Sequence, residues 1–227
     1  MLRETLDRQI HQLQDEVLLL GSMVEQATLG SVAALKNRDT ASAHKIYYAD
    51  RKINEKRYAI EQAVLILIAT QQPMAHDLRL MASILEVVGE LERMGDYAKG
   101  IAKIVIQLGE TEIPMPMREI DLMAREAVGM LHRALGAFID QNSALAATIP
   151  ADDDKVDALF NKINYSVIQA MIANPRIIDS ANLLMWVAHN LERMADRVTN
   201  ICERTIFVVS GELFELESKD LSSEDNV

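Results

Sequence analysis

Two copies of one short motif, 100 residues apart, constrain the fold of this chain more than any other feature of its sequence. Leu-Glu-Arg-Met-Gly-Asp at residues 91–96 returns as Leu-Glu-Arg-Met-Ala-Asp at residues 191–196, a match at five of six positions. Further back, Pro73 corresponds to Pro175 at an offset of 102, and Asp50 to Asp153 at an offset of 103. Such a correspondence between distant segments indicates an internal duplication. We therefore expect two halves with the same fold.

Each half should contain three long helices. In the first half, segments with helical periodicity run over residues 2–37, 40–70 and 74–108, with few glycines or prolines inside them. The third segment has apolar residues at alternating steps of four and three, which is the seam of packed helices. Its members are Leu80, Ile84, Val87, Leu91, Met94, Ala98, Ile101, Val105 and Leu108. The corresponding positions of the second half are Leu184, Val187, Leu191, Met194, Val198, Ile201, Thr205 and Val208.

These patterns predict an all-α fold of two tandem, sequence-related three-helix bundles with six long helices. We place the first bundle at residues 1–110 and the second at residues 117–217, after a connector with two prolines. Residues 218–227 are acidic and almost free of apolar side chains. They are predicted to be a disordered tail, since they cannot offset the entropy of ordering.

Charge and cysteine content exclude several classes of protein. The net charge of −11 opposes binding to nucleic acid or anionic lipid. The single cysteine, Cys202, excludes an intramolecular disulfide framework and fits a reducing compartment. The longest uninterrupted apolar stretch is Ala63–Ala69, far below the roughly 20 residues of a membrane-spanning helix. We expect a protein that is neither exported nor membrane-spanning.

Four pairs of oxygen-bearing side chains, each with a spacing of four residues, repeat between the halves. They are Asp50 with Asn54, Glu92 with Asp96, Asp153 with Asp157, and Glu192 with Asp196. Residues four apart share one face of a helix. If the second and third helices of each bundle lie side by side, each half brings two pairs of oxygen ligands together. Such clusters suit hard cations such as Mg, Mn, Ca or oxidised iron.

Other interpretations of these acids stay open. They could instead form salt bridges with basic residues nearby in the sequence, namely Arg93, Arg193, Arg197 and Lys52. An iron-handling enzyme or metal-storage bundle is another alternative, but the Glu-x-x-His signature of di-iron bundles is absent and His189 has no counterpart in the first half. A metal-free scaffold is the third. No catalytic nucleophile, triad or phosphate-binding loop is visible, so we predict no enzyme activity.

The duplicated motifs resemble those of the PhoU family of phosphate-transport regulators. The likeness rests on the two Glu-x-x-x-Asp motifs with their flanking Leu-Glu-Arg-Met, on Asp77-Leu78-Arg79, and on Asn200-Ile201-Cys202-Glu203, and it covers about residues 6–212. It implies a cytoplasmic accessory protein that acts as a negative regulator, linking the ATPase subunit of a phosphate ABC transporter to a sensor histidine kinase. It also implies a homodimer that is peripheral at most to the membrane.

The resemblance further implies metal ions or multinuclear clusters, of iron or of Mg, Mn or Zn, at the Glu-x-x-x-Asp motifs. These are Glu92, Asp96, Glu192 and Asp196, with Asp50, Asn54, Asp153 and Asp157 as companions. The halves differ where Asn54 stands opposite Asp157, and where Lys99 and Lys103 stand opposite Thr199 and Glu203. We therefore expect the first half to hold fewer or weaker metals.

Overall fold

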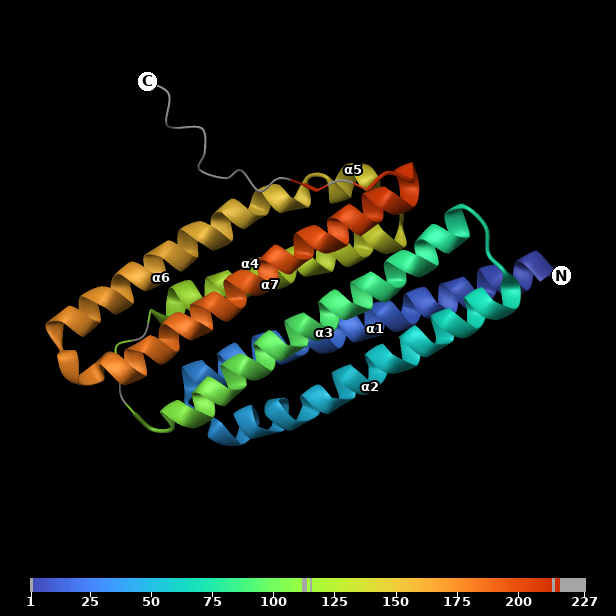
Figure 1. Cartoon of the computed structure of the whole chain (residues 1–227). Helices are drawn as coiled ribbons and strands as arrows, with labels where there is room; N and C mark the ends of the chain where they lie inside the picture. Colours follow the sequence, from blue (N-terminus) through green and yellow to red (C-terminus); the bar gives the residue numbers. More distant parts are fainter. Residues whose placement is uncertain (1, 112–113, 115, 214, 217–227) are drawn as a thin grey trace, which may run out of the picture.

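The chain folds into six long helices joined by short turns (Figure 1). A computed structural model describes residues 2–111, 114, 116–213 and 215–216. The long helices are α1 (Leu2–Asn37), α2 (Thr40–Gln71), α3 (His76–Leu108), α4 (Met117–Ile139), α6 (Asp153–Ala173) and α7 (Ile178–Ser210). No strand occurs in this part of the chain, and the predicted all-α class is confirmed. The predicted disordered tail, residues 218–227, lies outside the described residues, and the domain limits stay predictions.

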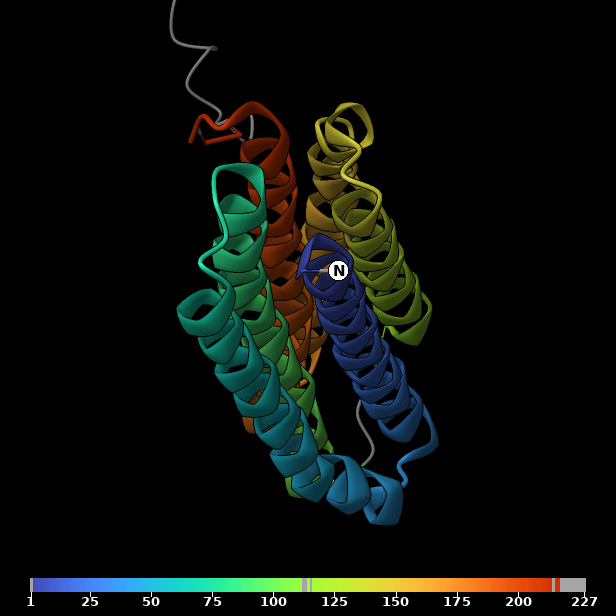
Figure 2. The ribbon, with the colours of Figure 1, turned by 90° about the vertical axis from the view of Figure 1, so that its right-hand side faces the viewer.

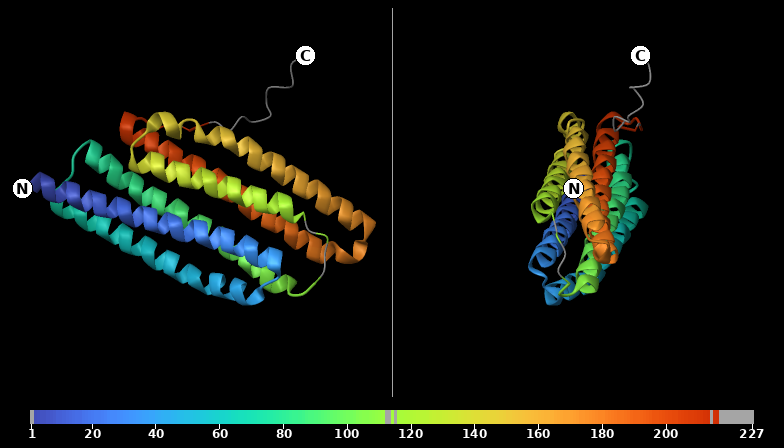
Figure 3. Two further views of the ribbon diagram at one scale, coloured as in Figure 1. Left: turned by 180° about the vertical axis from the view of Figure 1, so that it is seen from behind. Right: turned by 90° about the vertical axis from the view of Figure 1, so that its left-hand side faces the viewer.

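The helices form two three-helix bundles that pack against each other in antiparallel fashion. Helices α1 to α3 form the first bundle, and α4, α6 and α7 form the second. Helix α3 lies along α7, and α1 lies along α4, so these four helices make the centre of the molecule (Figure 2). Helix α2 contacts only the first bundle and α6 only the second, which leaves them at opposite edges (Figure 3).

Both predicted seams are buried. Every seam residue of α3 and α7, including Thr205, is shielded from solvent. The hydroxyl of Thr205 donates to the carbonyl of Ile201 at 3.0 Å. This bond within the helix satisfies the hydroxyl and lets a polar residue stand in an apolar seam.

Polar contacts fix the antiparallel register of α3 and α7. Glu90 of α3 accepts from Arg197 of α7 at 3.4 Å, and Glu86 pairs with Arg204 at 3.1 Å. Near the start of α3, Arg79 Nε donates to the carbonyl of Val208 at 3.3 Å. A cation at this end of α7 also complements the negative end of the helix dipole.

The second bundle departs from the duplicated scheme at the start of its middle helix. Where α2 is continuous, the second half has α5 (Ser143–Ala146), a 3-10 turn η1 (Ile149–Asp152) and then α6. Pro150 lies within η1 and has no N–H to donate, and it disfavours helical geometry at Ile149. A second 3-10 turn, η2 (Pro175–Ile177), precedes α7.

Helix α1 has the length and apolar composition of a membrane span over Glu4–Asn37, alone among the helices in the described ranges. Its buried residues, which include Leu13, Val17 and Leu20, belong to the core that α1 shares with α2, α3 and α4. The central helix of a bundle meets the same test of composition, so this feature is weak evidence for a span.

The packing of the core predicts that the same Leu→Ala substitution changes the free energy of unfolding by very different amounts at two positions. Leu191 of α7 is fully buried, whereas Leu65 of α2 is 57% exposed. Leu191→Ala should lower the free energy of unfolding by about 2–5 kcal/mol because it leaves a cavity. Leu65→Ala should change it by about 0.5 kcal/mol or less. Urea denaturation of both variants measures this, and equal losses would contradict the packing described.

Candidate functional site

The eight predicted ligand residues lie in two clusters, one between α2 and α3 and the other between α6 and α7. The first-repeat cluster comprises Asp50, Asn54, Glu92 and Asp96, on α2 and α3. The second-repeat cluster comprises Asp153, Asp157, Glu192 and Asp196, on α6 and α7. In each hairpin the two helices pack against each other, and interactions join side chains across them. The predicted pairing of helix faces is therefore present in both halves.

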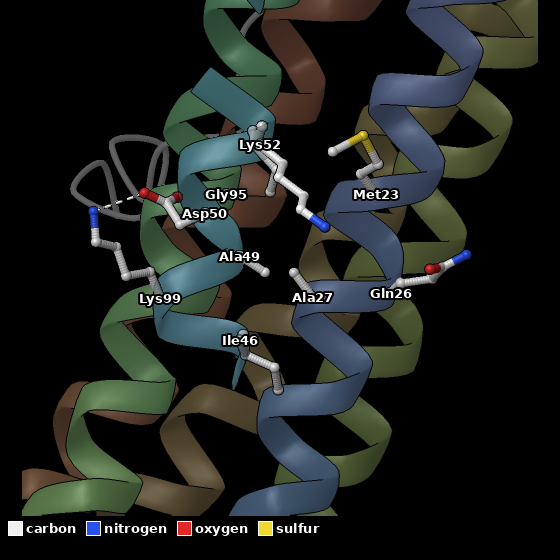
Figure 4. Close-up of a pocket in the computed structure, with 10 residues that line it drawn as sticks. Met23, Gln26, Ala27, Ile46, Ala49, Asp50, Lys52, Gly95 and Lys99 are labelled. Carbon is white, nitrogen blue, oxygen red and sulfur yellow. Dashed lines mark hydrogen bonds and ion pairs between the residues drawn. The ribbon is translucent and has the colours of Figure 1, made fainter. Parts of the chain in front are cut away.

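Asp50 is the most deeply buried member of the first-repeat cluster, with 5% of its surface exposed. Its Oδ2 accepts from Lys99 Nζ at 2.7 Å and from Asn54 Nδ2 at 3.2 Å. Figure 4 shows Lys99 reaching Asp50 from the neighbouring helix. The same ammonium lies 3.6 Å from Asp96 Oδ1. The pKa of Lys99 is raised, first through its hydrogen bond to Asp50, which keeps this side chain charged.

Gly95 brings the backbones of α2 and α3 close together at this cluster. A Cβ atom at Gly95 would lie 3.1 Å from Ile53 and 3.8 Å from Asp50 Oδ1. Beside it, between α1 and α2, a cavity of about 260 Å³ is bordered by Met23, Ala27 and Ala49 (Figure 4). The first-repeat cluster is thus tightly packed toward α3 and loosely packed toward α1.

Glu92 also has a cationic partner, which the sequence analysis did not identify. Arg57 of α2 lies 3.0 Å from Glu92 Oε2 and 2.7 Å from Glu61 Oε1. Its pKa is raised, first by the hydrogen bond to Glu61. A salt bridge within one helix could be read from the spacing of Arg57 and Glu61. The bond across to Glu92 depends on how α2 and α3 are rotated against each other.

The second-repeat cluster is a group of acids that repel one another. The pKa of Asp153 is raised to about 7, first by burial and then by the charges of Asp157, Asp196 and Glu192. The pKa values of Asp157, Glu192 and Asp196 are also raised, in each case first by burial. Asp153 Oδ1 and Glu192 Oε2 are buried and accept no hydrogen bond from the described part of the chain.

Two basic groups border this cluster without balancing it. Arg193 lies 2.8 Å from Asp196 Oδ2, so the alternative interpretation of these acids as salt-bridge partners holds for this pair. His189 Nδ1 lies 3.4 Å from Glu192 Oε2, but the contact lacks hydrogen-bond geometry. Arg93 and Arg197 pair instead with Glu90. Four carboxylates thus face Arg193 and His189, and the charge of Arg197 acts on Asp196 as well.

The two clusters differ in how well they fit a metal ion. Within the ranges that the structure describes, no three His, Cys, Asp or Glu side chains stand in an arrangement that could hold a metal as they are. The second-repeat cluster nevertheless has two buried oxygens that accept no hydrogen bond from the described residues, and more acids than basic groups, which suit a cation. In the first-repeat cluster, each of the three acids lies within salt-bridge distance of Lys99 or Arg57, although Asp50 Oδ1 is also buried without a hydrogen-bond partner among the described residues.

Cys202 is buried beside the seam of α7. Burial raises the pKa of its thiol to about 12. A thiol with such a pKa is a poor nucleophile and metal ligand near neutral pH. Its role in this position is apolar packing.

Comparisons with known proteins agree with the duplicated architecture. The sequence model of the PhoU domain matches residues 17–105 and again residues 120–205. A phosphate-specific transport system accessory protein PhoU homolog of Streptococcus pneumoniae serotype 4 is 33% identical over 215 residues, covering 95% of this chain and all of that protein. The phosphate-specific transport system accessory protein PhoU of Escherichia coli K12 is 31% identical, over 91% of this chain and 86% of that protein.

Solved structures give the same result. The crystal structure of the phosphate transport system regulatory protein PhoU from S. pneumoniae superposes with a TM-score of 0.86 at 31% identity, covering 93% of this chain and all of that one. PhoU from Pseudomonas aeruginosa superposes with a TM-score of 0.84 at 30% identity, covering 91% of this chain and 99% of that one.

The raised pKa of Asp153 predicts how stability depends on pH. The folded protein holds a proton on this carboxyl up to about pH 7, whereas the unfolded chain releases it near pH 4. The folded state therefore binds more protons between these values, and stability falls as pH rises from about 4 to about 7. Melting temperatures measured with a chelator present should show this decline, and Asp153→Asn should flatten it. Asp15→Asn, an exposed change on α1, should not; an unchanged slope in Asp153→Asn would contradict the assignment.

Proposed function

Because the chain belongs to the PhoU family, we propose that it is a regulatory accessory protein of phosphate uptake and not an enzyme. The observation that carries this proposal is the match of the family model to both halves, on a fold that superposes over nearly the whole chain with solved PhoU structures. The names of these relatives share a phosphate transport system, of which two are called accessory proteins and the third a regulatory protein. The described residues of the two clusters resemble ion-binding or ion-pairing groups rather than a nucleophile with its base.

The proposed role is that of a cytoplasmic negative regulator. It would connect the ATPase subunit of a phosphate ABC transporter to a sensor histidine kinase, and it would act as a homodimer when phosphate is plentiful. A net charge of −11 favours partners with basic surfaces and disfavours nucleic acid. The α6–α7 hairpin also exposes Tyr165, Ile172 and Trp186, at 67%, 69% and 53%. Exposed aromatic and aliphatic side chains of this kind serve as anchors in protein interfaces.

A metal ion is proposed at the second-repeat cluster, with Asp153, Asp157, Glu192 and Asp196 as the residues that would hold it. A bound divalent cation or iron would neutralise these acids and tie α6 to α7, which would fix the surface that a partner meets. The support is the pair of unpartnered buried oxygens and the mutual repulsion of the acids. A metal-free scaffold is the alternative.

Thermal stability separates these alternatives. Mn²⁺ should raise the melting temperature of chelator-treated wild type, because it binds only the folded cluster. The double variant Asp153→Asn with Asp196→Asn should melt at the same temperature with and without Mn²⁺. The isosteric change Asp15→Asn should leave the wild-type response intact. A wild type that does not respond would favour the scaffold.

The regulatory role is tested in cells. Deleting the gene for this chain should leave uptake of radiolabelled phosphate high in phosphate-rich medium, where the intact strain lowers it. Expression of wild type from a plasmid should restore the low uptake. Uptake that is unaffected by deletion, under both rich and starved conditions, would contradict the proposed role. Uptake that is lost on deletion would make the chain an activator instead.

A further inference from the structure

We propose that the first repeat carries its own cations, Lys99 and Arg57, in the place where the second repeat would bind metal, so that metal binding is confined to the second repeat. This inference rests on the metal site of the proposed function. It concerns side chains that the duplication did not preserve.

Lys99 occupies the position of a bridging cation. It extends from α3, and its ammonium contacts Asp50 of α2 at 2.7 Å and Asp96 of its own helix at 3.6 Å. One third of the side chain is exposed, whereas Asp50 is almost fully buried. Lys99 thus links the two helices through the carboxylates that a metal ion would need.

Arg57 is the second cation of the cluster. It extends from α2 to Glu92 of α3, 3.0 Å away, so a second cation crosses the same interface. Its other partner, Glu61, holds the guanidinium from the same helix at 2.7 Å. Every acid of the first-repeat cluster therefore has a cationic side chain within salt-bridge distance.

The second repeat lacks both cations. By the offset of 100 that relates α3 to α7, Thr199 stands where Lys99 stands. By the offset of 103 that relates α2 to α6, Phe160 stands where Arg57 stands. The neutral Asn54 is replaced by the acidic Asp157. At these three matched positions the second repeat thus has one acid more and two basic side chains fewer than the first, which makes its cluster more negative.

Metal binding to the first repeat would require the loss of these ion pairs. A metal ion at Asp50 Oδ2 would have to displace the ammonium of Lys99, and one at Oδ1, which has no hydrogen-bond partner among the described residues, would share the carboxylate with that ammonium and be repelled by it. The amide of Asn54 offers one neutral oxygen ligand in return. Both effects lower affinity relative to the second repeat.

The experiment is equilibrium dialysis of the full chain against Mn²⁺, with bound and free metal separated by electron paramagnetic resonance. Wild type should bind Mn²⁺ stoichiometrically. Glu92→Gln with Asp96→Asn should bind as much as wild type, whereas Glu192→Gln with Asp196→Asn should lose binding. Loss of Mn²⁺ in the first-repeat variant would overturn the inference while leaving the proposed metal regulation intact.

Exchange of residues between the repeats tests the cause directly. In the Glu192→Gln, Asp196→Asn background, the triple change Lys99→Thr, Arg57→Phe and Asn54→Asp should restore Mn²⁺ binding in the first repeat. The reverse change Thr199→Lys, in an otherwise wild-type chain, should weaken binding by about tenfold or more. It adds a cation to an acidic cluster, so its fold should be retained, and circular dichroism verifies this.

Failure of the inference and failure of the metal proposal give different results. If wild type binds no Mn²⁺, the proposed second-repeat site fails, and the same triple change made in wild type decides the inference: Mn²⁺ gained supports it, and none gained by a folded variant overturns it. If wild type binds Mn²⁺ but the triple variant unfolds, Thr199→Lys is the deciding variant, and undiminished binding in it overturns the inference.

If wild type binds no Mn²⁺ and the triple variant unfolds, the single change Lys99→Thr takes the place of the triple change. Mn²⁺ gained by that variant supports the inference, and none gained overturns it.

Discussion

The packing of α3 against α7 is the constraint on which the rest of the molecule depends. Both helices bury a continuous seam, and the pairs Glu86–Arg204 and Glu90–Arg197 hold them antiparallel. This packing places α3 and α7, which carry the two copies of the repeated motif, at the centre and leaves α2 and α6 at the edges. The acids at 92, 96, 192 and 196 lie beside the seams rather than in them. They therefore face the outer helices, which supply Asp50 and Asp153.

Partial burial then decides how each cluster behaves. Acids placed between two helices lose hydration. Each therefore needs either a cation beside its ionised form or a proton that removes its charge. The first repeat supplies the positive charge from its own side chains, Lys99 and Arg57. In the second repeat, burial and the neighbouring acids instead raise the pKa of Asp153 to about 7. Duplication thus gave two copies of one arrangement, and substitution at a few positions made them electrostatically different.

Much of this architecture could be predicted from the sequence because the helical signals are local. The seams of α3 and α7 follow from periodicity, and the ends of α1 and α2 lie within one residue of the predicted limits. The break before α6 was missed, although Pro150 is a visible signal for it. The bonds from Arg57 to Glu92 and from Lys99 to Asp50 could not be predicted, since they depend on the rotation and register of two helices. The replacement of Lys99 by Thr199 was visible, but its consequence required the structure.

The most direct test of the account is a crystal structure of the full chain grown with Mn²⁺, with anomalous scattering used to locate the metal. The account predicts anomalous density between α6 and α7, next to Asp153 and Glu192, and none between α2 and α3, where Lys99 contacts Asp50. Density at both hairpins, or at the first hairpin alone, would contradict it.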